Sequence, residues 1–203
     1  MANIVEFKDV SMSFGNNKVL KNIDLEIEKG KFYTLLGPSG CGKSTILKLI
    51  GGFLSPTSGD VLLDEKVVNE LPANKRQVNT VFQDYALFPH MNVYDNIAYG
   101  LKLQKRPKEE IQERVANILK IMKMEEFADR VPSQMSGGQQ QRVSLARALI
   151  MNSEVLLFDE PLSNLDAKLR VSMRVRITQL HQELKTTMIY VTHDQVEAMT
   201  MGD

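Results

Sequence analysis

The stretch Gly37–Thr45 reads GPSGCGKST and directly follows the apolar run Phe32–Leu36. It fits the pattern G-x-x-x-x-G-K-[ST], in which glycines let backbone N–H groups turn inward around a polyphosphate at a helix N-terminus. The pattern comprises Gly37, Pro38, Ser39, Gly40, Cys41, Gly42, Lys43, Ser44 and Thr45. Because apolar residues precede it as a strand and follow it at helical spacing, a phosphate loop is favoured over a chance glycine-rich turn. The sequence therefore predicts a nucleoside triphosphate site.

The composition of the chain excludes several classes of protein. Its 25 basic and 25 acidic residues balance, so no net charge attracts nucleic acid or anionic lipid. The start MANIVEFKDV lacks the apolar segment of a signal peptide, and no run approaches the ~18 apolar residues of a membrane span. The single cysteine, Cys41, excludes an internal disulfide and is expected to be a small, inert residue of the loop. We expect a cytosolic protein that binds no nucleic acid.

The hydrophobic pattern predicts an α/β fold. Alternating residues over 10–14 and 23–27 favour an antiparallel sheet with one exposed face. A turn is expected at Ser55–Gly59, and a long helix is expected over 164–184. Further strands are expected at Val61–Leu63, Val78–Gln83, Val155–Phe158 and Met188–Thr192. Strands that alternate with helices indicate a mostly parallel sheet with both faces covered.

Residues 89–151 change to a helical pattern. One apolar face is marked by Ile111, Val115, Ile118, Leu119 and Met122. Because this block separates two strand-rich stretches, we expect residues 1–88 and 152–203 to form a nucleotide-binding core with an antiparallel β subdomain. Residues 89–151 are expected to form an inserted helical subdomain. The expected fold class is that of a P-loop NTPase with a mostly parallel sheet.

Two further motifs carry polar chemistry. The apolar run Val155–Phe158 ends in two carboxylates, of which Asp159 suits a Mg²⁺ ion and Glu160 suits the orientation or deprotonation of water. An Asp-Glu pair after a strand is common in loops and alone does not indicate a site. In a chain that also has a phosphate loop, it favours a role in triphosphate hydrolysis. The segment Ser136–Gln139 precedes a helical pattern and supplies N–H groups and a hydroxyl for a second anion site. Since one nucleotide already has its loop, this second site is expected to serve a nucleotide held mainly by another subunit.

Together these motifs resemble the nucleotide-binding subunits of ATP-binding-cassette (ABC) transporters over nearly the whole chain. The run MSGGQ at 135–139 is similar to the signature motif of that family, with Met135 where leucine is commoner. Gln83 resembles the Q-loop glutamine, SNLD at 163–166 the D-loop, His193 the switch histidine, and Phe14 the aromatic residue that stacks on adenine. These motifs occur along the chain in the same order as in the family, so a chance resemblance is not a reasonable explanation.

The resemblance implies a head-to-tail dimer of two copies that sandwiches two ATP molecules. Each nucleotide lies between one copy's phosphate loop and the other copy's Ser136, Gly137, Gly138 and Gln139. The resemblance implies that Lys43 and Thr45 bind phosphate oxygens and that Ser44, Asp159 and Gln83 bind Mg²⁺. Gln83 is also implied to bind the attacking water, for which Glu160 would be the general base. His193 is implied to bind the γ-phosphate, and Asp166 is implied to link the two sites. The implied activity is ATP hydrolysis coupled to transmembrane transport.

The segment Asp84–Met91, DYALFPHM, is a candidate contact with a membrane partner. Exposed aromatic rings at Tyr85 and Phe88 can couple the nucleotide state to a partner surface. The alternative is that both rings pack between the core and the helical subdomain.

The resemblance narrows to importers. Arg76–Leu103 is similar to the ATPases of bacterial spermidine/putrescine importers, whereas Phe158–Arg170 is equally similar to those of sugar and ferric-ion importers. In this group a solute-binding protein delivers the solute to separate permease subunits, and the ATPase lies peripherally on the inner face of the cell membrane. We favour a polyamine as the solute. Because such chains usually continue past Asp203, we expect this sequence to be a fragment without a C-terminal regulatory domain.

Two other classes fit less well. A soluble ABC ATPase of translation or DNA repair shares the nucleotide-site motifs, but it typically carries tandem cassettes or a long coiled-coil insertion, and neither is present. A switch GTPase needs an Asn-Lys-x-Asp motif, and neither Asn17-Lys18 nor Asn74-Lys75 is followed by the required aspartate. The transporter ATPase is therefore the preferred hypothesis.

Overall fold

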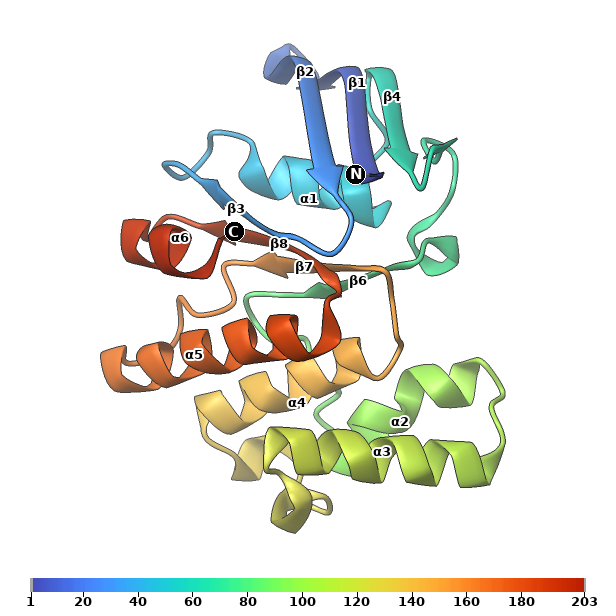
Figure 1. The fold of residues 1–203 in the computed structure, drawn as a ribbon, viewed down its shortest axis with the longest axis vertical. Helices are drawn as coiled ribbons and strands as arrows, with labels where there is room; N and C mark the ends of the chain where they lie inside the picture. The colour runs from blue at the N-terminus through green and yellow to red at the C-terminus, as the bar shows by residue number, and fades with distance from the viewer. Residues whose placement is uncertain (1, 203) are drawn as a thin grey trace. The chain divides into compact units, whose positions relative to one another are not determined.

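The computed structural model describes residues 2–202, which form two compact units (Figure 1). The first unit consists of residues 2–80, 154–160 and 174–202, and the second consists of Val81–Ser153 and Pro161–Met173. The helical subdomain expected at 89–151 lies within the second unit. Among the described residues, no helix is both long enough and apolar enough to cross a bilayer.

A four-stranded sheet of the first unit has the order β2-β1-β4-β5. Its strands are β1 (Asn3–Phe14), β2 (Asn17–Glu28), β4 (Ser58–Leu63) and β5 (Lys66–Val67). β1 pairs antiparallel with both β2 and β4, which confirms the prediction of an antiparallel sheet. The turn expected at Ser55–Gly59 is shorter than predicted, because Ser58 already pairs with Ser11 of β1. Gly59 allows this approach, since a Cβ there would lie 2.3 Å from the carbonyl oxygen of Asp9.

The second four-stranded sheet has the order β3-β8-β7-β6. Its strands are β3 (Phe32–Leu36), β6 (Val78–Val81), β7 (Val155–Asp159) and β8 (Thr187–Thr192), and α6 (Gln195–Met201) follows β8. β8 pairs in parallel with both β3 and β7, and all of its residues are buried, as expected for a strand covered on both faces. β6 ends before the predicted Gln83. Because β3, β7 and β8 are parallel, the residues after them meet at one edge, namely the phosphate loop, Glu160 and His193.

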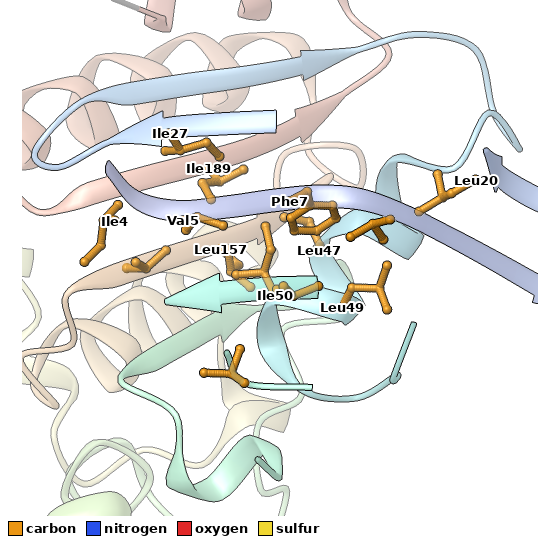
Figure 2. Close-up of a cluster of buried hydrophobic side chains, with 14 of the residues drawn as sticks. Ile4, Val5, Phe7, Leu20, Ile27, Leu47, Leu49, Ile50, Leu157 and Ile189 are labelled. Carbon is orange, nitrogen blue, oxygen red and sulfur yellow. The ribbon is translucent and has the colours of Figure 1, made fainter. Parts of the chain in front are cut away.

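α1 (Lys43–Gly51) packs into the main core of the first unit (Figure 2). Its Leu47, Leu49 and Ile50 are buried in a cluster with apolar residues of β1, β7 and β8. A helix of 9 residues is not stable alone, since isolated helices shorter than about 12–15 residues are marginal in water. The apolar packing therefore holds the N-terminus of α1, where Lys43 and Ser44 lie.

The second unit is built mainly from α2 (Val93–Leu103), α3 (Lys108–Met122) and α4 (Gly137–Leu149), which pack against one another. The apolar face that the sequence predicted for α3 is buried. α5 (Ala167–Leu184) starts in this unit and continues into the first. It begins later than the predicted residue 164, because the Asp166 carboxylate accepts a hydrogen bond from the Leu169 N–H at 3.0 Å and so caps the helix. Short 3₁₀ turns lie at η1 (Ala73–Lys75), η2 (Glu125–Phe127) and η3 (Pro132–Gln134).

Candidate functional site

The phosphate loop leads from the end of β3 into α1. Gly40 and Gly42 have φ angles of 82° and 100°, in the left-handed region that favours glycine. A Cβ at Gly42 would also lie 2.8 Å from Cδ2 of Leu20, so this position has no room for a side chain. Cys41 between the two glycines is exposed. The glycines thus allow the tight backbone turn that the motif predicts.

The side chain of Lys43 folds back into this loop. Its Nζ atom donates hydrogen bonds to the carbonyl oxygens of Gly37 at 2.7 Å and Pro38 at 2.8 Å. Lys43 is only 8 % exposed. A cation held among main-chain oxygens beside a helix N-terminus is well placed for phosphate oxygens, which form stronger, charge-assisted hydrogen bonds than carbonyl groups do. Thr45 lies in the first turn of the same helix and is half-buried.

Ser44 and Asp159 form an oxygen pair next to the loop. The hydroxyl of Ser44 donates to Oδ1 of Asp159 at 2.8 Å. Hydroxyl and carboxylate oxygens suit Mg²⁺, which is usually held by one or two carboxylates together with substrate phosphates and water. Within residues 2–202, no group of three or more His, Cys, Asp or Glu side chains could hold a metal ion. The two oxygens of this pair are thus of the type that Mg²⁺ prefers.

Glu160 and His193 lie together at the same sheet edge. Nδ1 of His193 is 3.1 Å from Oε2 of Glu160, and the side chains are 56 % and 21 % exposed. Glu160 has a φ of 46° although it is not glycine, and its N–H donates to the Val191 carbonyl at 3.1 Å. A left-handed backbone at a residue with a side chain is strained, and such strain is common at active sites. The sequence predicted a role for each residue but not their direct contact.

Gln83 belongs to the second unit and follows β6. Its side chain is exposed, and its carbonyl accepts a hydrogen bond from Nδ2 of Asn164 at 3.0 Å. This bond joins the residue that resembles the Q-loop glutamine to the segment that resembles the D-loop. The role of Gln83 on metal and water stays a prediction.

The residues just after Gln83 are held by α4. Tyr85 and Ala86 have φ angles of 61° and 46°, so two consecutive residues are left-handed. The Tyr85 carbonyl accepts from the Ser144 hydroxyl and from Arg147, both at 3.0 Å, and the Ala86 carbonyl accepts from Arg147 at 2.7 Å. Burial lowers the pKa of the Arg147 guanidinium, while the charge of Asp84 acts in the opposite direction. The helix that begins at the SGGQ segment is thereby bonded to the segment that follows Gln83.

The expectation of an exposed Tyr85 ring is wrong. Tyr85 is 6 % exposed, and burial raises the pKa of its phenol. Its hydroxyl has no hydrogen-bond partner among the described residues. The left-handed backbone accounts for the difference, since it turns the chain at this point. Phe88 is half-buried, and the centroid of its ring lies 4.5 Å from that of the Tyr99 ring.

The SGGQ segment forms the N-terminus of α4. The Ser136 hydroxyl accepts from the Gln139 N–H at 3.4 Å, and the Gln139 side chain accepts from the Ser136 N–H at 2.9 Å. This is a capping box, and a hydroxyl that accepts one hydrogen bond can still donate its own proton to an anion. A Cβ at Gly138 would lie 2.4 Å from Cδ2 of Leu169 in α5, whereas one at Gly137 would meet only Leu165, at 3.7 Å. A side chain at Gly138 would therefore displace Leu169, independently of any ligand.

Two further residues that the sequence predicted for the site, Phe14 and Asp166, are exposed. Phe14 is exposed at the end of β1, in the first unit. Asp166 is exposed in the second unit, where its carboxylate caps α5. Adenine stacking by Phe14 and the link between two sites by Asp166 stay predictions.

The sequence interpretation missed Gln141. This side chain is fully buried, and its Nε2 atom donates to the Pro161 carbonyl at 2.9 Å, directly after Glu160 in the chain. One signal was available, because Gln141 lies four residues before the buried Leu145 and so shares its apolar helix face. A polar residue on such a face needs a buried partner.

Three comparisons with known proteins bear on the chain. The ABC transporter family model matches residues 20–163. The spermidine/putrescine import ATP-binding protein PotA of Oleidesulfovibrio alaskensis is 57 % identical over 200 residues, which are 98 % of this chain and 54 % of that protein. The chain thus spans about half the length of this relative.

Solved structures agree with the family match. CbiO1 of Clostridium perfringens, described as part of the ABC transporter complex cbiONQ, gives a TM-score of 0.86 at 31 % identity over 96 % of this chain and 80 % of that chain. A dimer of the ATP-binding cassette MJ0796, described as a post-hydrolysis state bound to ADP and Pi, gives 0.84 at 35 % identity over 98 % of this chain and 91 % of that chain.

Proposed function

The chain belongs to the ABC transporter family, and we propose that it is the ATP-binding and ATP-hydrolysing part of an importer for polyamines. The observation that carries the proposal is the meeting of three features at one sheet edge: the Lys43 loop, the Ser44–Asp159 pair and the Glu160–His193 pair. Together they supply a cation for phosphates, oxygen ligands for a metal and a candidate base. The similarity to a spermidine/putrescine import protein supports the choice of solute.

In the proposed site, Lys43 exchanges its two carbonyl partners for phosphate oxygens of ATP. The N–H groups of the loop and of the start of α1 bind the same oxygens, and Thr45 adds a hydroxyl. Ser44 and Asp159 hold Mg²⁺, with Gln83 as a further oxygen donor. When bound, the ion neutralises charge on the phosphates.

Glu160 is the proposed general base, and His193 holds both Glu160 and the γ-phosphate. A carboxylate hydrogen-bonded to an imidazole keeps a fixed direction, so it can accept a proton from water at a defined position. Gln83 orients that water. The short distance between Nδ1 of His193 and Oε2 of Glu160 supports this division of roles.

The complete site requires a second copy of the chain. The nucleotide held by the phosphate loop of one copy is also bound by four residues of the other copy, namely Ser136, Gly137, Gly138 and Gln139. Phe14 stacks on the adenine of the nucleotide. The N-terminus of α4 supports this role, since the partial positive charge at a helix start attracts anions and Ser136 and Gly137 there are exposed. Asp166 links the two sites of the dimer.

The proposed partners are transmembrane permease subunits, reached through the segment Asp84–Met91, and through them a solute-binding protein. Phe88 and His90 retain accessible surface in this segment. The proposed location is the cytoplasmic face of the cell membrane, where the chain is a peripheral subunit. Sugar and ferric-ion importers are the alternatives for the solute.

The test is reconstitution of the full-length protein with its permease subunits in liposomes. We expect ATP hydrolysis to rise when the solute-binding protein is loaded with spermidine or putrescine, and Lys43→Ala to abolish it. Lys21→Ala, which changes an exposed lysine of β2, is the matched control and should leave hydrolysis intact. Stimulation by a sugar or ferric ion instead would select the alternative solute. Association with ribosomes or DNA, and none with permeases, would contradict the transporter function.

A further inference from the structure

Glu197 is a buried carboxylate on α6. It is 5 % exposed, and carboxylates are almost never fully buried unless they are paired. Its Oε2 atom accepts two hydrogen bonds, from the Tyr190 hydroxyl at 3.0 Å and from the Thr192 hydroxyl at 2.7 Å. Both donors are buried residues of β8. The carboxylate therefore ties α6 to the last residues of β8.

These bonds continue across His193, which lies between Thr192 and Asp194. The Thr192 hydroxyl accepts a hydrogen bond from the Asp194 N–H at 3.0 Å while it donates to Glu197. The Asp194 carboxylate accepts from the N–H groups of Val196 and Glu197 at 2.7 and 3.2 Å and so starts α6. The backbone on both sides of His193 is thus fixed by one continuous set of hydrogen bonds.

The His193 side chain itself has little packing. It is more than half exposed, and its ring makes a polar contact with Glu160. An exposed ring that is not held by neighbours depends on its backbone for direction. A small shift of that backbone would move the ring away from Glu160, and displacements of about 1 Å at an active site can lower a rate about 100-fold.

We propose that Glu197 is the positioning residue of His193: through Thr192 and the start of α6, its buried carboxylate sets the direction in which the imidazole reaches Glu160. The importance of this position for turnover rests on the proposed function, whereas the geometric effect does not.

Tyr190 provides the second anchor of the carboxylate. Burial, followed by the charge of Glu197, raises the pKa of the Tyr190 phenol, so the hydroxyl keeps its proton and remains a donor at neutral pH. Two buried donors on one oxygen leave Glu197 a single favourable orientation. Glutamine can accept the same two bonds through its carbonyl oxygen, while alanine can accept neither.

The first experiment observes His193 directly, in the full-length protein without nucleotide. The imidazole ¹⁵N signals of His193 are assigned by their loss in His193→Ala. We expect Glu160→Ala and Glu197→Ala to shift these signals in the same direction, because both disturb the contact between imidazole and carboxylate. Glu197→Gln should leave them at the parental positions. Parental signals in Glu197→Ala, together with shifted signals in Glu160→Ala, would overturn the proposal.

A second pair of variants covers the case in which Glu197→Ala does not fold. Thr192→Val removes the linking hydroxyl at similar volume, and Thr192→Ser keeps it. We expect shifted His193 signals in the valine variant and parental signals in the serine variant. Unshifted signals in the valine variant would also overturn the proposal.

The second experiment measures hydrolysis in the assembled transporter. We expect Glu197→Ala to lower kcat about tenfold or more, with the KM for ATP changed less than about twofold, because the substrate contacts remain. The double variant Glu197→Ala/His193→Ala should be no slower than His193→Ala, since residues that act through one another are not additive. Additive losses would contradict positioning through His193. If His193→Ala hydrolyses ATP at the parental rate, the proposed catalytic role of His193 fails, and the ¹⁵N signals still decide the effect of Glu197.

Discussion

Nδ1 of His193 lies 3.1 Å from Oε2 of Glu160, and each residue directly follows one of two neighbouring parallel strands. Asp159 pairs with Val191 in the register of β7 and β8, so the two chain ends leave the sheet side by side. This arrangement fixes a base candidate and its hydrogen-bond partner by strand pairing alone.

Glu160→Gln should preserve ATP binding and stall turnover. The amide keeps the size of the side chain but cannot take a proton from water, so we expect hydrolysis to fall about 100-fold or more. Calorimetric titration with ATP and a phosphate-release assay separate the two effects. Glu154→Gln is the control and should retain activity, because the Glu154 side chain is exposed and forms a surface ion pair with Lys29. Parental hydrolysis in Glu160→Gln would remove Glu160 from the base role.

Asp159→Asn should weaken the response to magnesium. The substitution removes the charge that faces the Ser44 hydroxyl, and we expect the Mg²⁺ concentration for half-maximal hydrolysis to rise about 10- to 100-fold. Binding of ATP without Mg²⁺ should change little, because Lys43 and the loop are untouched. A magnesium titration of the hydrolysis rate tests this. An unchanged titration curve would show that Asp159 does not hold the ion.

Gly138→Ala should destabilise the protein even without a nucleotide. The new methyl group meets Leu169, and overpacking of this kind costs about 1–3 kcal/mol of unfolding free energy. Gly137→Ala is the matched control: it has room, and alanine is the better helix former, so its stability should match or exceed the parental value. Leu169→Ala should restore much of the loss in Gly138→Ala. Urea unfolding of the four proteins provides the comparison, and equal stability of both glycine variants would contradict the packing explanation.

The stability of the protein should fall at alkaline pH partly because of Tyr190. Burial and Glu197 raise the pKa of this phenol above its ordinary value of 10.0. Above that pH, Tyr190 loses its proton in the unfolded chain and keeps it in the folded one, so unfolding becomes easier as the pH rises. Below it, the group contributes no pH dependence. Urea unfolding at about pH 8 to about pH 11 should therefore show a shallower decline in Tyr190→Phe than in the parental protein, and equal declines would contradict the effect.

Much of the fold could be predicted because its signals are local. The phosphate loop follows a strand and opens a helix within a short stretch, and the buried strand Val155–Asp159 is marked by a continuous apolar run. Once those strands are parallel, the meeting of Asp159, Glu160 and His193 at one edge follows from the topology. Element ends were less certain, since the start of β4 depends on how closely Gly59 approaches Asp9 in another strand.

The burial of Tyr85 could not be predicted from its neighbours in sequence. It depends on a left-handed backbone and on Arg147, which lies 62 residues further along the chain. Glu197 was missed for a similar reason, because a glutamate on a short helix normally faces water. Only the pairing of its carboxylate with Tyr190 and Thr192 of β8 distinguishes it from a surface residue.

The hydrogen bonds of Lys43 to Gly37 and Pro38 have a consequence for ligand choice. Two neutral carbonyl oxygens already occupy donors of the ammonium group, which is largely withdrawn from solvent. Oxygens that carry a negative charge form stronger hydrogen bonds with an ammonium group than these carbonyls do. We therefore expect a guest to displace the lysine from its resting contacts more readily as the negative charge that it brings to the loop increases.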